Sequence, residues 1–192
     1  ANKIWNASRY VLMNLSVDEP GLPDVSKLEL EDKWVLSKLN TLIREVTENM
    51  DAYELGVASA KVYDFIWDTY CDWYIELTKA RLYDADEESK RIAQQVLVYV
   101  LDQLLRLLHP FMPFITEEIW QAIPHEGDFL IRAEWPTPNA ALDFAAEADA
   151  LEMVKNAVSQ GGAVRRVGAQ RLFPAGRGLY PPPCVCRSGR PV

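Results

Sequence analysis

Residues 96–108 read VLVYVLDQLLRLL and carry large apolar side chains on nearly every side of a helix. Asp102, Gln103 and Arg106 interrupt the run, so it is not a membrane-spanning segment. A helix that is apolar all round is packed on several sides. The run therefore predicts the central helix of a helical protein. Its aliphatic members are Val96, Leu97, Val98, Val100, Leu101, Leu104, Leu105, Leu107 and Leu108.

Helical periodicity extends outward from this run over residues 1 to about 124. Ser26 and Glu29 have the spacing of a capping box, which predicts the start of a second helix. A third helix starts near residues 51–54, and the acids at 84–88 suit the first turn of the central helix. With short loops between them, these segments predict an all-α fold, an antiparallel bundle of four to five helices. The second helix has a buried stripe of Val35, Leu39, Leu42, Ile43, Val46 and Met50.

The sequence after residue 124 has a different character. Residues 129–131, Phe-Leu-Ile, precede Trp-Pro at 135–136 and predict a short extended exit segment with room for one strand. Helical periodicity returns over 145–158 and collapses after Gln160 into Gly-, Arg- and Pro-rich sequence. We therefore divide the chain into a bundle at 1–124, an exit segment and C-terminal helix at 125–158, and an irregular tail at 159–192.

Net charge also distinguishes the tail from the rest of the chain. The 192 residues carry a net charge of −8, and 49% are hydrophobic, as in ordinary globular proteins. The last 32 residues contain six Arg and no acid, so residues 1–160 hold 14 of the 20 basic and all 28 acidic side chains, a net charge of −14. This balance argues against a general nucleic-acid coat or a basic membrane-surface protein. A single cysteine, Cys71, precedes residue 160, which favours a reducing compartment, the cytoplasm.

Catalytic and metal-binding motifs are missing from the sequence. The two histidines, His109 and His125, have no Glu three residues before them, so a di-metal carboxylate bundle is excluded. No glycine-rich phosphate loop occurs, and no Ser or Cys nucleophile can be paired with a His base. His109 precedes a proline at a helix end and is interpreted as structural. Cys184 and Cys186 lack further ligands for zinc, so we expect no catalytic site, metal or cofactor in this chain.

Four acids recur at i, i+4 spacing on the third helix: Asp64, Asp68, Asp72 and Glu76. This acidic ridge has a functional interpretation, a metal site or a contact for a basic partner. The favoured interpretation is structural, because like charges at this spacing cost a few tenths of a kcal/mol each and need compensation. Lys or Arg from an adjacent helix is the simplest source. The ridge should repel phosphates.

The first helix presents a polar face with Asn2, Lys3, Asn6, Arg9 and Tyr10. Amide, cationic and aromatic side chains of this kind read unstacked RNA bases and hold phosphates. Any solvated helix can show a similar face, so these five RNA-binding candidates rest on helical geometry alone. The opposite face carries Ile4, Trp5, Ser8, Val11, Leu12 and Leu15. The tryptophans assigned mainly to packing are Trp5, Trp34, Trp67, Trp73 and Trp120.

Four long segments closely resemble the valyl-tRNA synthetases, in the helical anticodon-binding domain of that class I family. They are ANKIWNASRYVLMNL at 1–15, EDKWVLSKLNTLIREVTENMDAY at 31–53, YDFIWDTYCDWYIELTKARLY at 63–83 and LLHPFMPFITEEIWQAI at 107–123. Residues 127–136 resemble the segment that leaves the bundle there. The isoleucyl-tRNA synthetases share the general plan and remain the alternative. The runs WNASR at 5–9 and CDWYIE at 71–76 look valyl.

The resemblance implies a parent enzyme that attaches valine to tRNA-Val using ATP with Mg and edits threonyl-tRNA. The class I nucleotide-binding signatures are absent from this sequence, so the resemblance implies tRNA recognition here and catalysis elsewhere in the parent. The expected partners are tRNA-Val and the catalytic domain of the same protein, with no membrane. The chain has no initiator Met and is in helical periodicity by Ile4, which indicates a fragment. The rival interpretations are a stand-alone helical interaction module and, third, a metal-dependent hydrolase.

The tail departs from the resemblance. The family would continue a helix into a coiled-coil arm that touches the tRNA. Residues from about 159 instead resemble a shifted reading frame of GC-rich DNA, and we hypothesise that they are non-native. We also expect tRNA to meet a face away from the acidic ridge.

Overall fold

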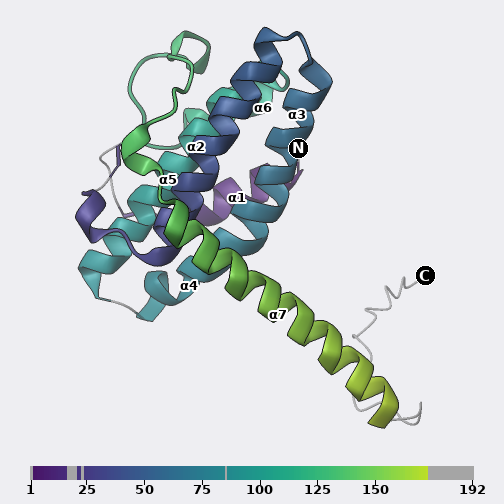
Figure 1. Cartoon of the computed structure of the whole chain (residues 1–192). Coiled ribbons are helices and arrows are strands. Elements are labelled where there is room, and N and C mark those ends of the chain that lie inside the picture. The colour runs from purple at the N-terminus through teal and green to yellow at the C-terminus, as the bar shows by residue number, and fades with distance from the viewer. Residues whose placement is uncertain (1, 17–20, 23, 85, 173–192) are drawn as a thin grey trace, which may run out of the picture. The chain divides into compact units, whose positions relative to one another are not determined.

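The computed structural model describes residues 2–16, 21–22, 24–84 and 86–172. All regular structure in this part of the chain is helical, which confirms the predicted all-α class (Figure 1). Within the described residues, the part up to Glu152 forms one compact unit and the part from Met153 onward a second. None of the helices described is both long enough and apolar enough to cross a membrane.

The elements are given in chain order. They are α1 (Asn2–Met13), η1 (Val25–Lys27), α2 (Leu30–Asp51), α3 (Leu55–Asp64), η2 (Phe65–Tyr74), α4 (Ile75–Asp84), α5 (Glu87–Leu108), α6 (Pro113–Trp120), η3 (Leu130–Arg132), η4 (Ala140–Leu142) and α7 (Ala145–Leu172).

Helix α5 contains residues 96–108 and contacts α1, α2, α3, α4 and α6. All nine of its aliphatic side chains named above are buried. The hydroxyl of Tyr70 donates a hydrogen bond of 3.0 Å to the carbonyl oxygen of Leu97. Burying each such aliphatic side chain contributes roughly 1.5–3 kcal/mol. The predicted packing of this run on several sides is confirmed.

Helix starts follow local capping rules, with one difference from the sequence prediction. Asp86 caps α5 by accepting a 2.7 Å hydrogen bond from the backbone N–H of Ser89, and acids fill the first turn as predicted. The capping box of α2 is formed by Glu29 with Asp32, so the predicted pairing of Ser26 with Glu29 is wrong. Asp24 accepts from Ser26 instead, which starts the short η1 turn before α2.

A buried ion-pair cluster joins α2, η2, α4 and α5. Arg81 is 6% exposed and donates to Asp32 Oδ2 from Nη1 at 2.8 Å. Tyr74 donates its hydroxyl to the other oxygen of Asp32 at 2.7 Å, and Arg81 Nε donates to Ser89 Oγ at 2.9 Å. We call these four residues the Arg81 cluster. Each buried charge in it has a partner, which is the condition for a buried ion pair to be tolerated.

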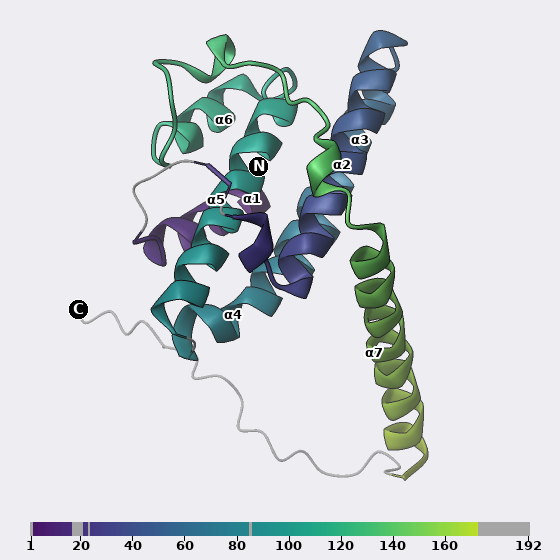
Figure 2. The ribbon, with the colours of Figure 1, turned by 60° about the vertical axis from the view of Figure 1, so that its left-hand side comes forward.

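The third helix is continuous over α3, η2 and α4, and its middle segment η2 has π-helical hydrogen bonding. Segments of this kind are rare and frequently occur at functional sites. Figure 2 shows the helix beside α2, from which it is separated by a tight turn. Tyr53 in that turn has φ 60°, an uncommon conformation for a bulky residue.

Of the five tryptophans assigned to packing, two are exposed, and Trp73 is half-buried and packs against the core. Trp34 and Trp120 are fully buried, which confirms their assignment, whereas Trp5 is 40% and Trp67 is 41% exposed. For Trp5 the reason is geometric, because the buried face of α1 is formed by Ile4, Ala7, Ser8 and Val11.

The exit segment contains no strand among the residues described, so the single strand allowed for it is wrong. Leu130 lies instead in the short η3 turn, between extended residues Phe129 and Ala133. An isolated strand would have no ladder partner in an all-helical unit. The segment is held by other contacts, since Trp135 Nε1 donates to Thr47 Oγ1 at 2.9 Å and η4 packs on α2.

Helix α7 continues to Leu172, so the predicted loss of helix after Gln160 is wrong. Gly161 and Gly162 each cost roughly 1 kcal/mol relative to Ala in a helix. The surrounding Ala, Arg and Gln residues favour helix and outweigh that cost. Cys184, Cys186 and the rest of residues 173–192 lie outside the described residues.

Candidate functional site

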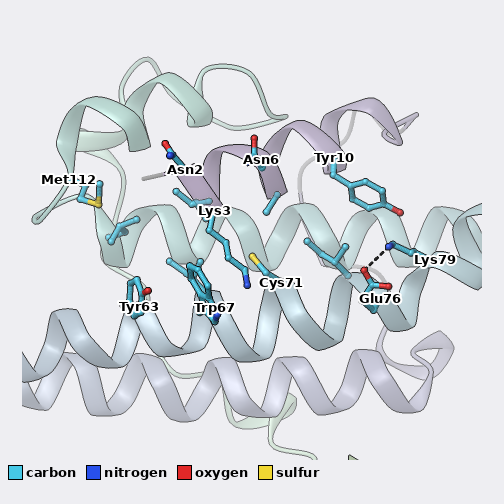
Figure 3. Close-up of a pocket in the computed structure, with 15 residues that line it drawn as sticks. Asn2, Lys3, Asn6, Tyr10, Tyr63, Trp67, Cys71, Glu76, Lys79 and Met112 are labelled. Atoms are coloured by element: carbon cyan, nitrogen blue, oxygen red, sulfur yellow. Dashed lines mark hydrogen bonds and ion pairs between the residues drawn. The ribbon is translucent and has the colours of Figure 1, made fainter. Parts of the chain in front are cut away.

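A groove of about 830 Å³ runs between α1 and the third helix (Figure 3). We call it the α1–η2 groove. Its floor is apolar, and amide, cationic, acidic and aromatic groups form its rim. Its polar, aromatic and sulfur-containing lining residues are Asn2, Lys3, Asn6, Tyr10, Tyr63, Trp67, Cys71, Glu76, Lys79 and Met112.

Lys3 crosses the groove from α1 to the third helix. Its Nζ lies 2.6 Å from Asp72 Oδ1 and 3.7 Å from the centroid of the Trp67 ring. The ammonium is therefore both an ion-pair partner and a cation on the face of an aromatic ring. The side chains of Lys3 and Asp72 keep 27% and 50% of their exposure, so solvent screens the pair.

Trp67 also stacks on Tyr63. The two ring centroids are 5.7 Å apart and the planes are inclined by 24°. The two side chains are 41% and 58% exposed, so they form an accessible aromatic pair on the rim. Exposed aromatic faces of this kind are platforms on which unstacked bases bind.

The opposite end of the groove holds Tyr10, Glu76 and Lys79. Lys79 Nζ lies 2.5 Å from Glu76 Oε1, and the hydroxyls of Tyr10 and Tyr83 are 3.5 Å apart. Burial, followed by the hydrogen bond with Tyr83, raises the pKa of Tyr10 well above its usual value. Tyr10 is thus a neutral hydroxyl at physiological pH.

Cys71 lies in the wall of the groove and is not an activated nucleophile. Burial raises the pKa of its thiol to about 11, against the lowering effect of Lys3. The thiolate is the reactive form, so this thiol is inert at neutral pH. No group of His, Cys, Asp and Glu among the residues described could hold a metal ion.

The acidic ridge borders this groove. Asp72 is neutralised by Lys3 from the adjacent helix, as the structural interpretation predicts, and Glu76 pairs with Lys79 on its own helix. Asp64 and Asp68 are exposed. The polar face of α1 therefore lies against the ridge, and whether tRNA meets a face away from the ridge stays a prediction.

Four of the five candidates chosen from the sequence line the groove together: Asn2, Lys3, Asn6 and Tyr10. Arg9 is exposed on α1 and is not among the lining residues. Whether any of them contacts tRNA stays a prediction. The sequence reasoning missed Tyr63 and Trp67, although each directly precedes an acid of the exposed ridge, and that neighbourhood is the signal that they face solvent.

His109 has a structural contact, as interpreted from its sequence position. Its Nδ1 lies 2.8 Å from Thr116 Oγ1, which joins the end of α5 to α6.

A family described as "Anticodon-binding domain of tRNA ligase" matches residues 32–169. Valine–tRNA ligase of Bacillus cereus (strain ATCC 10987 / NRS 248) is 47% identical over 175 residues, covering 88% of this chain and 19% of that protein. Valine–tRNA ligase of Lactiplantibacillus plantarum is 49% identical over 156 residues, covering 80% and 18%. That of Enterococcus faecalis is 45% identical over 170 residues, covering 88% and 19%. The chain thus spans about a fifth of the length of these relatives.

Proposed function

This chain belongs to the anticodon-binding domain family of tRNA ligases, and we propose on that premise that it binds and positions tRNA-Val for a valine–tRNA ligase. The parent enzyme would attach valine to tRNA-Val using ATP with Mg, in the cytoplasm. The catalytic steps would take place in a domain outside this chain. The role proposed for this chain is recognition of the tRNA.

The observation that carries this proposal is the identity of 45–49% with valine–tRNA ligases over most of the chain. It favours a valyl over an isoleucyl parent, in agreement with the runs at 5–9 and 71–76. The same match disfavours a stand-alone interaction module, because the relatives of this chain are ligases about five times its length.

Within the chain, we propose the α1–η2 groove as the contact for unstacked anticodon bases. Its exposed aromatic pair offers a stacking face, and Asn2 and Asn6 offer amide donors and acceptors for base edges. Tyr63 stacks on Trp67, and the ammonium of Lys3 also lies over the Trp67 ring. A base that stacks on Trp67 where Lys3 now lies would displace Lys3 and free its charge for a phosphate.

The charges of the groove favour the binding of bases over the binding of phosphates inside it. Asp72 and Glu76 lie in or beside it, and the cations nearest to them are already paired. Phosphates would be repelled by the exposed carboxylates of Asp64 and Asp68 on the same ridge. We therefore propose that bases enter the groove and that phosphates contact its edge, where Arg9 is an exposed cation on α1.

A filter-binding titration of this chain against tRNA-Val and a non-cognate tRNA tests the proposal. We expect tighter binding of tRNA-Val, weakening as salt rises because phosphate contacts release counterions. Negligible and salt-insensitive binding of both tRNAs would support the interaction module instead.

The status of residues 159–192 is a separate proposal. The family match extends to residue 169 and helix α7 extends to Leu172. Both therefore continue past residue 159, from which we expected the sequence to depart from the family. We propose that the Arg- and Pro-rich end is a shifted reading frame. Resequencing the coding DNA tests this, and an uninterrupted native frame through residue 192 would refute it.

A further inference from the structure

The wall that the third helix contributes to the α1–η2 groove is built from every fourth residue. Its members, which Figure 3 shows in sequence along the groove where it labels them, are Tyr63, Trp67, Cys71, Ile75 and Lys79. An α-helix turns by about 100° per residue, so each step of four residues drifts by about 40°. On an α-helix Tyr63 and Lys79 would therefore point about 160° apart. A straight row of this length needs a helix that winds more slowly.

The side of the third helix that faces the core has the same spacing. Its buried residues are Val62, Ile66, Tyr70, Tyr74, Thr78 and Leu82. Both rows pass through η2, and at its end the backbone N–H of Ile75 donates to the carbonyl oxygen of Tyr70, five residues earlier. Hydrogen bonds that span five residues wind the helix less per residue than bonds that span four, which offsets the drift of the α-helical parts. The π-helical winding of η2 therefore keeps the groove wall in one line.

Two buried tyrosine hydroxyls hold η2 against its neighbours. Tyr70 is fully buried and donates a hydrogen bond of 3.0 Å to the carbonyl oxygen of Leu97 on α5. Tyr74 donates to Asp32 on α2 and belongs to the Arg81 cluster, which holds the end of η2 without Tyr70. A rare backbone conformation persists only where the surrounding structure fixes it. In the middle of η2, Tyr70 provides that contact.

We infer that Tyr70 is a positioning residue of the α1–η2 groove, because its hydroxyl holds η2 in the π-helical form that directs Trp67 into the groove. Tyr70 does not line the groove, so it acts through Trp67. Without its hydrogen bond, the part of η2 that precedes Tyr70 is free to wind as an α-helix, which turns Trp67 away from Lys3. The effect on tRNA binding rests on the proposed function, whereas the effect on Trp67 is measured on the free protein.

Tyr70→Phe tests the inference, because it removes the hydroxyl and keeps the packing of the ring. Lys3 reports where Trp67 lies, since its Nζ is 3.7 Å from the centroid of that ring and the ring current moves the NMR signals of the Lys3 ε-protons upfield. Lys3→Arg identifies these signals. We expect the upfield shift to shrink in Tyr70→Phe. Filter binding should show an affinity for tRNA-Val about fivefold to tenfold lower, the factor that corresponds to one hydrogen bond.

Tyr99→Phe is the matched control. Tyr99 is a partly buried tyrosine of α5 that packs against the core and does not line the groove, so its variant should change neither the Lys3 signals nor the affinity. An equal loss in Tyr99→Phe and Tyr70→Phe would show general loosening of the core and overturn the inference.

The two measurements separate this inference from the proposed function. Unchanged Lys3 signals in Tyr70→Phe would overturn the inference, because the groove wall would then keep its form without the hydroxyl. A smaller upfield shift with unchanged affinity for tRNA-Val would overturn the role of Tyr70 in positioning. If the unmodified chain does not bind tRNA-Val, the proposed function fails, and the Lys3 signals alone decide whether Tyr70 holds the groove wall.

Discussion

The third helix forms two ion pairs of similar length, Arg81 with Asp32 and Lys3 with Asp72. The first pair is buried and the second is exposed to solvent. Their shortest distances are 2.8 Å and 2.6 Å. The side chains of the first pair are 7% and 0% exposed, whereas those of the second are 27% and 50% exposed. Arg81 is held by further hydrogen bonds to Ser89, whereas Lys3 lies on an aromatic face that another planar group could take.

The difference separates stability from recognition. Removing one partner of a buried pair leaves an uncompensated charge, so the Arg81 cluster cannot rearrange without loss of the fold. A screened surface pair contributes little to stability and exchanges partners easily. The first pair therefore fixes the bundle, and the second is suited to a groove in which a ligand displaces a side chain.

The strongest test of this comparison is Arg81→Met. Because the substitution leaves the buried Asp32 carboxylate without its cation, we expect the free energy of unfolding to fall by about 3–5 kcal/mol. Tyr74→Phe should cost less, about 1–3 kcal/mol, since it removes one hydrogen bond and keeps the ion pair. Urea denaturation followed by circular dichroism measures both.

The control is Lys27→Met, which breaks the exposed pair of Lys27 with Glu88. It should leave the urea midpoint almost unchanged. A loss at Lys27 as large as that at Arg81 would show that burial does not distinguish the pairs of this protein.

The next effect concerns the aromatic pair. Trp67→Ala should weaken tRNA-Val binding by about 1–3 kcal/mol, because it removes the stacking face of the groove. Tyr53→Ala is the matched control, since Tyr53 is 88% exposed and lies outside the groove. Filter binding at fixed salt measures both variants. Equal affinities of Trp67→Ala and the unmodified chain would remove the groove from the proposed tRNA site.

The sequence is sufficient to predict the helical bundle, but it predicts only part of the α1–η2 groove. Residues 96–108 predict the central helix because an all-round apolar surface leaves a helix no solvated side. Helical spacing predicts packing for Trp67 because aromatic residues in such a pattern are usually buried, whereas its exposure depends on how the third helix packs against α1. Lys3 and Asp72 are 69 positions apart, and no local pattern predicts that they meet. The continuation of α7 through Gly161 was missed because glycine lowers helix propensity without forbidding a helix.

A smaller effect is expected when the Lys3 pair is loosened. Asp72→Asn removes a negative charge from the groove and frees Lys3, so tRNA-Val should bind more tightly, by about 0.5–1 kcal/mol. Asp68→Asn removes an equal charge from the same ridge and leaves the Lys3 pair intact. Isothermal titration of both variants separates release of Lys3 from loss of repulsion, and identical gains would mean that release of Lys3 does not contribute to tRNA binding.

The smallest effect is expected at Arg9, which the structure puts on α1 outside the lining of the groove. If it contacts a phosphate at the edge, Arg9→Ala should weaken binding of cognate and non-cognate tRNA alike and lower the slope of log affinity against log salt by about 1. Titrations at several salt concentrations measure that slope. A loss confined to tRNA-Val, with the slope unchanged, would instead assign Arg9 to base recognition and extend the readout beyond the groove.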